Sequence, residues 1–346
     1  MRGTPESCQL RPEYQRREGA ILAGGYTHLT LVRSAITSVC NRKYESGVLP
    51  WQSALADVLE IWSRYAYLGG VSPDYPYLGF DAEWADHMHK GGTDRMVSAA
   101  MPAIYREKKN NSGGRVWQQQ FAWLLGLAAH VVTDVVIHPV VNLKVGKYEA
   151  NKVRHRLCEM NQDVWIYRRR INLDLHYSDN MKTEVKSCGR RFDLEDAVED
   201  LWAACMETAY GERPGDHQID KWHAAFQSLV DFAENGCRIP FFSRHLVDGA
   251  VAYPDFDDAA HSEFVTNLLV PLGDDLNADG IAVESGQPMA FDAIFDRALE
   301  KTQELWDVLA LDLFERDMVG NAHLTAFKDW NLDTGADNVT GRLSLW

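Results

Sequence analysis

Apolar residues recur three and four positions apart along most of the chain, whereas the alternation typical of strands is sparse. Thr27 is a predicted N-cap for the first helical segment, and Gly69-Gly70 mark the end of the second. The predicted helices cover residues 27–39, 51–70, 147–170, 193–210, 219–236 and 291–317. The sequence therefore predicts an all-α fold, built as a multi-helix bundle.

One stretch, "FAWLLGLAAHVVTDVVIHPVV" at residues 121–141, is almost wholly apolar. Its length is close to the ~20 apolar residues that cross a bilayer. However, the uninterrupted apolar run covers only residues 121–129, and Asp134 near the bilayer centre would cost about 2.5 to 3.5 kcal/mol. Pro139 is expected to end the helix, because the residue before a proline resists helical geometry. We therefore expect a core helix and no transmembrane segment.

His130, Asp134 and His138 interrupt this stretch at intervals of four residues. Residues four apart share one helix face, so His130 and Asp134 can bind the same metal ion. His138 lies about 12 Å along the helix from His130, which suggests more than one ion. Buried imidazole and carboxylate groups need a partner of some kind, so the stripe alone fits either a metal site or a polar network in the core.

Further histidines and carboxylates occur in the first half of the chain. "HRLCE" places His155 and Glu159 four residues apart on a second helix, and Asp163 continues that face as a group that could orient a ligand. His87 and His89 lie in "ADHMHKGGTD", which we interpret as a polar loop. Taken singly, these residues also fit a surface ion pair and an ordinary loop.

Asp74 and His28 complete the candidates. Asp74 lies in the Pro-rich loop "VSPDYPYL", where a turn-forming role is the simpler interpretation, and His28 opens a helix after Gly24-Gly25. Imidazole and carboxylate together suit zinc, and a cysteine-free site with several ions is typical of phosphate-ester hydrolysis. By contrast "DWNLDTG", residues 329–335, is compact and turn-like, and nothing in the sequence indicates its role.

Composition and charge narrow the choice of partners. Hydrophobic residues make up 46% and charged residues 25%, as in ordinary globular proteins. The net charge of −15 disfavours stable nucleic-acid binding, although an enzyme can still bind phosphate through metal ions. The six cysteines are scattered, and residues 1–20 form a polar arm without an apolar signal segment. We therefore expect reduced thiols and a cytoplasmic location, with signal-independent export left open.

Five segments, in their order, resemble the zinc-dependent phospholipase C family, whose relatives include the S1/P1-type nucleases. They are "GGYTHL", "YLGGVSPDYPYL", "MHKGGT", "LGLAAHVVTDVVIHP" and "HRLCEMNQD". The resemblance implies an all-α bundle of the phospholipase C and P1 nuclease type, with two or three zinc ions. It implies one ion at Asp74, His89, His130 and Asp134, a second at His138, His155 and Glu159, and a third at His28 and the shared Asp134.

Other assignments also follow from the resemblance. His89 is preferred to His87 because Thr93 follows it by four residues, as in the family. Asp74 is the predicted catalytic carboxylate that orients or deprotonates the attacking water, and Tyr75 is a predicted contact for a substrate headgroup. Secreted members complete the third site with the amine of an N-terminal tryptophan. Here the first tryptophan is Trp51, which lies beyond His28.

The predicted function is zinc-dependent hydrolysis of a phosphodiester, as in a phospholipase C. An S1/P1-like nuclease or nucleotidase and a non-catalytic, metal-stabilised binding module are the alternatives. The predicted domains are an N-terminal arm (1–20), a phospholipase C-like helical core (21–185) and a helical C-terminal region (186–346) that could belong to the same domain. The sequence does not indicate the substrate headgroup or the oligomeric state.

Overall fold

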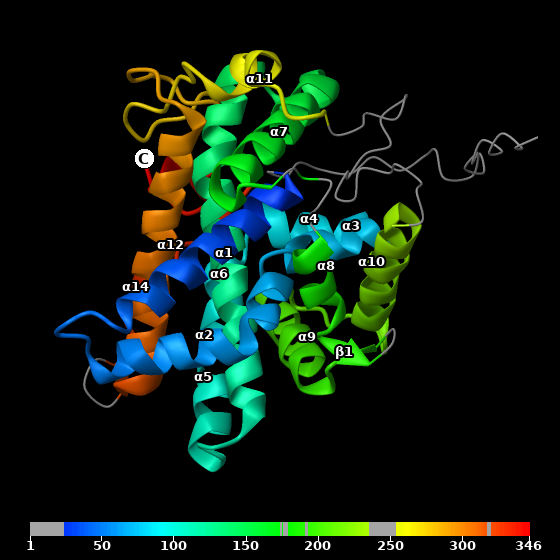
Figure 1. Ribbon diagram of the computed structural model, residues 1–346, viewed down its shortest axis with the longest axis vertical. Coiled ribbons are helices and arrows are strands. Elements are labelled where there is room, and N and C mark those ends of the chain that lie inside the picture. The colour runs from blue at the N-terminus through cyan, green and yellow to red at the C-terminus, as the bar shows by residue number, and fades with distance from the viewer. Residues whose placement is uncertain (1–23, 174, 176–178, 191–192, 235–253, 317–319) are drawn as a thin grey trace, which may run out of the picture.

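The computed structural model describes residues 24–173, 175, 179–190, 193–234, 254–316 and 320–346. The predicted N-terminal arm, residues 1–20, lies outside these described residues. The described part is predominantly helical, which confirms the predicted all-α class (Figure 1). The helices are α1 (Gly25–Arg42), α2 (Pro50–Gly69), the 3-10 helix η2 (Ser72–Asp74), α3 (Tyr75–Leu78), α4 (Ala82–Lys90), α5 (Thr93–Asn110), α6 (Arg115–Val145), α7 (Tyr148–Ile171), α8 (Asp179–Lys186), α9 (Asp196–Tyr210), α10 (Gln218–Glu234), α11 (Asp258–Val265), α12 (Phe291–Phe314) and α14 (His323–Ala326).

Strands play a small part in the described residues. Strands β1 (Gly189–Arg190) and β2 (Asp193–Leu194) form a short antiparallel pair before α9. A second antiparallel sheet closes the chain, in the order β3 (Trp330–Asn331), β4 (Ala336–Asp337) and β5 (Arg342–Leu343).

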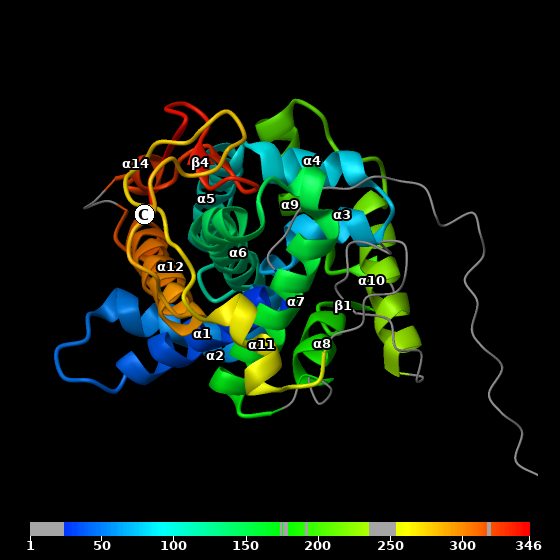
Figure 2. The same ribbon diagram turned by 90° about the horizontal axis from the view of Figure 1, so that it is seen from above.

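Helix α6 forms the centre of the molecule. It packs against α1, α2, α5, α7, α9 and α12, so it is surrounded by other helices (Figure 2). By length and composition α6 could cross a membrane, with a mean hydropathy of 1.8 in its most apolar window. That window is 100% buried inside the fold, as expected for a core helix. Since α9 and α12 belong to the second half of the chain, both predicted regions share this core, and the division at residue 185 stays a prediction.

Glycines allow α2 and α6 to pack backbone against backbone. A Cβ atom on Gly69 would lie 2.0 Å from the Trp123 carbonyl oxygen, and one on Gly126 would lie 2.0 Å from the Ala66 oxygen. Any side chain at either position would force the helices apart. The close packing also brings the end of α2 against α6, where the Gly70 carbonyl meets the His130 imidazole, 3.0 Å from Nδ1.

Three local predictions need correction. Pro139 does not end its helix, because α6 continues to Val145. The predicted polar loop with His87 and His89 is the helix α4, and the predicted Pro-rich loop contains η2 and α3. The prolines of that segment occupy first-turn positions, where the missing N–H is not needed.

Helix α1 begins at Gly25, not at Thr27, and it is capped from another helix. Asp163 of α7 accepts hydrogen bonds at Oδ1 from the Thr27 amide at 2.7 Å and from the Thr27 hydroxyl at 2.6 Å. A Cβ atom on Gly24 would lie 2.1 Å from Oδ2 of this carboxylate, so the approach requires glycine. The carboxylate stabilises the positive end of the helix dipole and ties α1 to α7 one residue before His28.

Candidate metal centre

The eight predicted ligands come together from five elements. Helix α6 supplies three of them on one face, at intervals of four residues. Helix α7 supplies a pair at the same spacing, while α1, η2 and α4 supply one each. The eight residues are His28, Asp74, His89, His130, Asp134, His138, His155 and Glu159.

Asp134 lies at the centre of the cluster. Its Oδ1 atom lies 3.3 Å from His28 Nε2 and 3.8 Å from His138 Nε2. Its Oδ2 atom lies 3.1 Å from His130 Nε2 and 4.0 Å from His89 Nε2. One carboxylate therefore faces four imidazoles from three helices.

Asp74 and Glu159 extend the cluster on two sides. Oδ1 of Asp74 lies 3.6 Å from His89 Nε2. Oε1 of Glu159 lies 3.8 Å from His138 Nε2 and 3.4 Å from His155 Nδ1. Donor atoms of His28, Asp74 and His130 lie within 4.8 Å of one another, as do those of His89, His130 and Asp134. These spacings suit a metal ion held between the groups.

Backbone carbonyl groups orient three of the imidazoles. The Nδ1 atoms of His89, His130 and His138 lie 2.7, 3.0 and 2.5 Å from the carbonyl oxygens of Ala85, Gly70 and Leu332. A proton held at Nδ1 leaves the Nε2 lone pair free, and each Nε2 faces the carboxylates. This is the usual arrangement of metal-binding histidines, in which the second ring nitrogen is hydrogen-bonded outside the site.

Burial and lack of partners together show that the residues fit a metal. Six of the eight side chains are fully buried, whereas Asp74 and Glu159 are 5% and 4% exposed. Each of the eight has at least one buried nitrogen or oxygen without a hydrogen-bond partner. Buried polar atoms are normally satisfied, so this concentration needs an explanation, and bound cations would supply one. Imidazole nitrogen and carboxylate oxygen are ligands that zinc prefers.

The charges inside the cluster are strongly coupled. Burial alone would raise the pKa of Asp134, but the surrounding histidines outweigh burial and hold this pKa well below its usual range. Burial and the neighbouring His130 lower the pKa of His28. Burial would also lower the pKa of His130, but attraction to Asp134 outweighs it and raises that pKa. The ionised carboxylate thus attracts positive charge, which a metal ion supplies without protonating the imidazoles.

Comparison with known proteins identifies the family. The model of the zinc-dependent phospholipase C family matches residues 27–212, which is more than half of the chain. The chain belongs to the zinc-dependent phospholipase C family. No curated protein and no solved structure matches it. Membership confirms the resemblance and, together with the His/Asp groups, supports a metal-dependent, phospholipase C-like function.

The ligand roles of the eight residues and the number of ions stay predictions. The structure brings all eight together, and it places His89 rather than His87 in the cluster. The ring of His87 lies outside the cluster and stacks on Tyr210, with centroids 5.4 Å apart. The predicted third site consists of His28 and the shared Asp134, and the donor atoms of His28 also lie close to those of Asp74 and His130.

Tyr75, the predicted headgroup contact, is packed inside the fold. It is fully buried, and its hydroxyl lies 3.2 Å from His223 Nδ1. Its ring packs against Trp202 and Phe226, at centroid distances of 6.0 and 5.1 Å. The structure therefore gives Tyr75 a packing role, and its contact with a substrate headgroup stays a prediction.

Three neighbours of the cluster were not predicted. Asn142 continues the four-residue stripe of α6 and lies with Oδ1 3.1 Å from His155 Nε2. Its spacing from His138 was a usable signal, but the expected helix end at Pro139 concealed it. Arg156 is buried with Nη1 3.4 Å from Glu159 Oε2. Leu332, which accepts from His138, acts through its backbone and carries no sequence signal.

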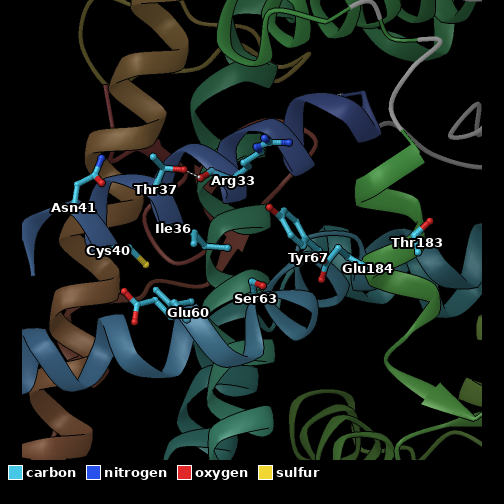
Figure 3. Close-up of a pocket in the computed structure, with 11 residues that line it drawn as sticks. Arg33, Ile36, Thr37, Cys40, Asn41, Glu60, Ser63, Tyr67, Thr183 and Glu184 are labelled. Atoms are coloured by element: carbon cyan, nitrogen blue, oxygen red, sulfur yellow. Dashed lines mark hydrogen bonds between the residues drawn. The ribbon is translucent and has the colours of Figure 1, made fainter.

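A cavity of about 620 Å³ between α1, α2 and α8 shares no residue with the cluster (Figure 3). Its lining includes Arg33 and Thr37 of α1 and Glu60 and Tyr67 of α2, which Figure 3 draws as sticks. The residues that line it include polar side chains, but no histidine and none of the predicted ligands. The candidate chemistry therefore lies in the buried cluster around α6, not in this cavity.

Proposed function

We propose that the protein hydrolyses the phosphodiester bond of a phospholipid between phosphorus and the glycerol oxygen. Water supplies the oxygen that bonds to phosphorus, and its protons end on the released glycerol hydroxyl and the phosphorylated headgroup. The observation that carries the proposal is the set of unpartnered nitrogen and oxygen atoms buried on eight residues around Asp134. Membership of the zinc-dependent phospholipase C family supports this substrate class.

Zinc bound at the cluster would lower the pKa of a coordinated water towards neutrality and would stabilise negative charge on the phosphate. We assign the five histidines and the carboxylates of Asp74, Asp134 and Glu159 to binding the ions, with the imidazoles neutral. The cluster contains three carboxylates, so two divalent ions would leave it with a net positive charge. An acidic protein could then attract a phosphate at this one place.

Asp74 is the group that we assign to orienting and deprotonating the attacking water. It is slightly exposed, at 5%, and its buried Oδ1 has no hydrogen-bond partner. A carboxylate at the edge of the cluster can meet both the metal and incoming water. Its short helix η2 follows α2 directly, so the close α2–α6 packing supports its position.

An assay on two substrate panels tests the proposal. Zinc-loaded protein is incubated with phosphatidylcholine and phosphatidylethanolamine vesicles, and separately with oligonucleotides and nucleotides. We expect diacylglycerol and a phosphorylated headgroup, formed by the native protein and not by Asp134→Asn. Turnover of nucleotides alone would favour an S1/P1-like activity instead. Zinc binding without turnover on either panel would contradict catalysis and favour a non-catalytic module.

A further inference from the structure

The C-terminal sheet, defined as residues 330–343, contacts the cluster of predicted ligands through the backbone of the sheet. The Leu332 amide donates to the carbonyl oxygen of His89 at 2.7 Å. The Leu332 carbonyl oxygen lies 2.5 Å from His138 Nδ1. One residue outside the family match therefore touches two predicted ligands that lie 49 positions apart.

The next carbonyl reaches a third predicted ligand through a relay. Asn142 donates from Nδ2 to the Asp333 carbonyl oxygen at 2.9 Å. The same amide group presents Oδ1 to His155 Nε2 at 3.1 Å. His155 therefore directs Nδ1 inward, where it lies 3.4 Å from Glu159 Oε1.

Residues 332–335 form the turn between β3 and β4, and its position depends on Pro139 and Gly335. Pro139 has no N–H, so the Val135 carbonyl four residues earlier lacks its helical donor. Gly335, at φ +74°, packs against that place, and a Cβ atom on it would lie 2.6 Å from both the Val135 oxygen and Pro139 Cγ. The indole of Trp346 donates to the Val136 oxygen at 2.9 Å, which adds a second anchor.

We infer that the C-terminal sheet completes the second predicted metal site by orienting its two histidines. Consecutive carbonyls of Leu332 and Asp333 hold His138 directly and His155 through Asn142. Without them each ring could rotate or change its protonated nitrogen, and the site would lose affinity for its ion. This inference rests on the proposed function, and it makes residues beyond the family match necessary for the metal centre.

Two glycines of the sheet provide a matched test. Both Gly335 and Gly341 have positive φ, at +74° and +67°, so alanine strains the backbone at either position. Only at Gly335 does the new methyl group meet α6, because nothing lies within 4 Å of a Cβ at Gly341. Zinc affinity is measured by competition with a chromophoric chelator, and cobalt-substituted protein reports the ligand geometry through its visible spectrum.

We expect Gly335→Ala to lower the affinity for one zinc ion by about 10- to 100-fold and to change the visible spectrum of the cobalt-substituted protein. Gly341→Ala should bind every ion like the native protein. Asn142→Leu removes the relay itself and leaves the Gly335 contact with α6 unchanged, so it should weaken binding of the same zinc ion. It decides the matter if Gly335→Ala fails to fold. Native affinity for every ion in folded Gly335→Ala and Asn142→Leu would overturn this inference alone. Absence of zinc binding by the native protein would overturn the proposed function as well.

Discussion

His28 and His130 lie face to face between α1 and α6, with ring centroids 4.0 Å apart and ring planes inclined by 6°. Their Nε2 atoms point to different oxygens of Asp134, at 3.3 and 3.1 Å. Two stacked imidazoles repel each other when both are charged, and burial together with His130 lowers the pKa of His28. The pair is therefore better suited to binding cations on either side of a shared carboxylate than to binding two protons.

Replacement of the shared carboxylate should abolish most metal binding. Asp134→Asn keeps the size of the side chain but removes the charge that faces four imidazoles. We expect zinc affinity to fall by more than the roughly 100-fold that loss of an outer hydrogen bond can cost. Isothermal titration calorimetry on the metal-free proteins measures it. His87→Ala, outside the cluster, is the control and should bind zinc normally.

Removal of the metal should destabilise the protein, and the loss of stability should be smaller at low pH. The pKa of His130 is raised above its usual 6.5 in the metal-free fold, since attraction to Asp134 outweighs burial. A proton on His130 therefore stabilises the metal-free fold below about pH 6.5, and this contribution is lost as the pH rises. Zinc competes for the same nitrogen and binds better at higher pH.

Thermal unfolding with zinc and with chelator measures this competition. We expect the difference in Tm between the two conditions to be largest near pH 8 and to shrink steadily towards pH 5. Readdition of zinc should restore the higher Tm. A difference that grows as the pH falls would show that the histidines do not bind the ion.

The glycine contact between α2 and α6 should be intolerant of any side chain. Gly126→Ala places a methyl group against the Ala66 carbonyl and pushes the Gly70 carbonyl away from His130. We expect a loss of about 1–3 kcal/mol in the free energy of unfolding, measured in urea. Gly113→Ala, where a Cβ meets nothing within 4 Å, should change it by less than about 0.5 kcal/mol. Equal effects of the two changes would disprove the close contact.

The helical fold could be predicted from hydrophobic periodicity, and the central helix from its almost wholly apolar sequence, because a helix buried on all sides is apolar on all sides. The stripe of His130, Asp134 and His138 was predictable for the same reason, since polar residues in such a helix stand out. The continuation of α6 to Asn142 was not, because Pro139 favours a helix end locally. Gly335 of the C-terminal sheet and the indole of Trp346 support this continuation from outside.

Contacts that depend on backbone atoms leave no pattern in the side chains. The carbonyl of Leu332 orients His138, yet any residue at position 332 has a carbonyl. Likewise, the capping of α1 by Asp163 joins residues 136 positions apart, and no local spacing predicts it. The order of the motifs was enough to predict the family and the residues of the cluster, whereas these long-range contacts could be found only in the three-dimensional structure.

Tyr75→Phe separates packing from substrate binding. The change removes the hydrogen bond to His223 and leaves the ring among its aromatic neighbours. We expect a loss of about 1 kcal/mol of stability and an unchanged KM for phosphatidylcholine. A KM that rises several-fold while the stability stays native would instead support the headgroup contact predicted from the sequence.

Glu199 should make stability depend on pH independently of any metal. Partial burial and the nearby Asp220 raise its pKa from the usual 4.5 to about 7 in the folded protein. The unfolded chain ionises first, so this group lowers stability as the pH rises from about 4.5 to about 7. Glu199→Gln should therefore raise the Tm at pH 8 more than at pH 4.5. Glu212→Gln, at an exposed glutamate, is the control for removal of one negative charge from the surface.

Diffraction from crystals grown with zinc, recorded on both sides of the zinc absorption edge, tests the central claim most directly. The account predicts one anomalous peak among Asp74, His89, His130 and Asp134, and another among His138, His155 and Glu159. It also predicts that only the second of these peaks weakens in Gly335→Ala. Zinc-containing crystals with no anomalous peak inside the cluster would contradict the assignment of this site as a metal centre.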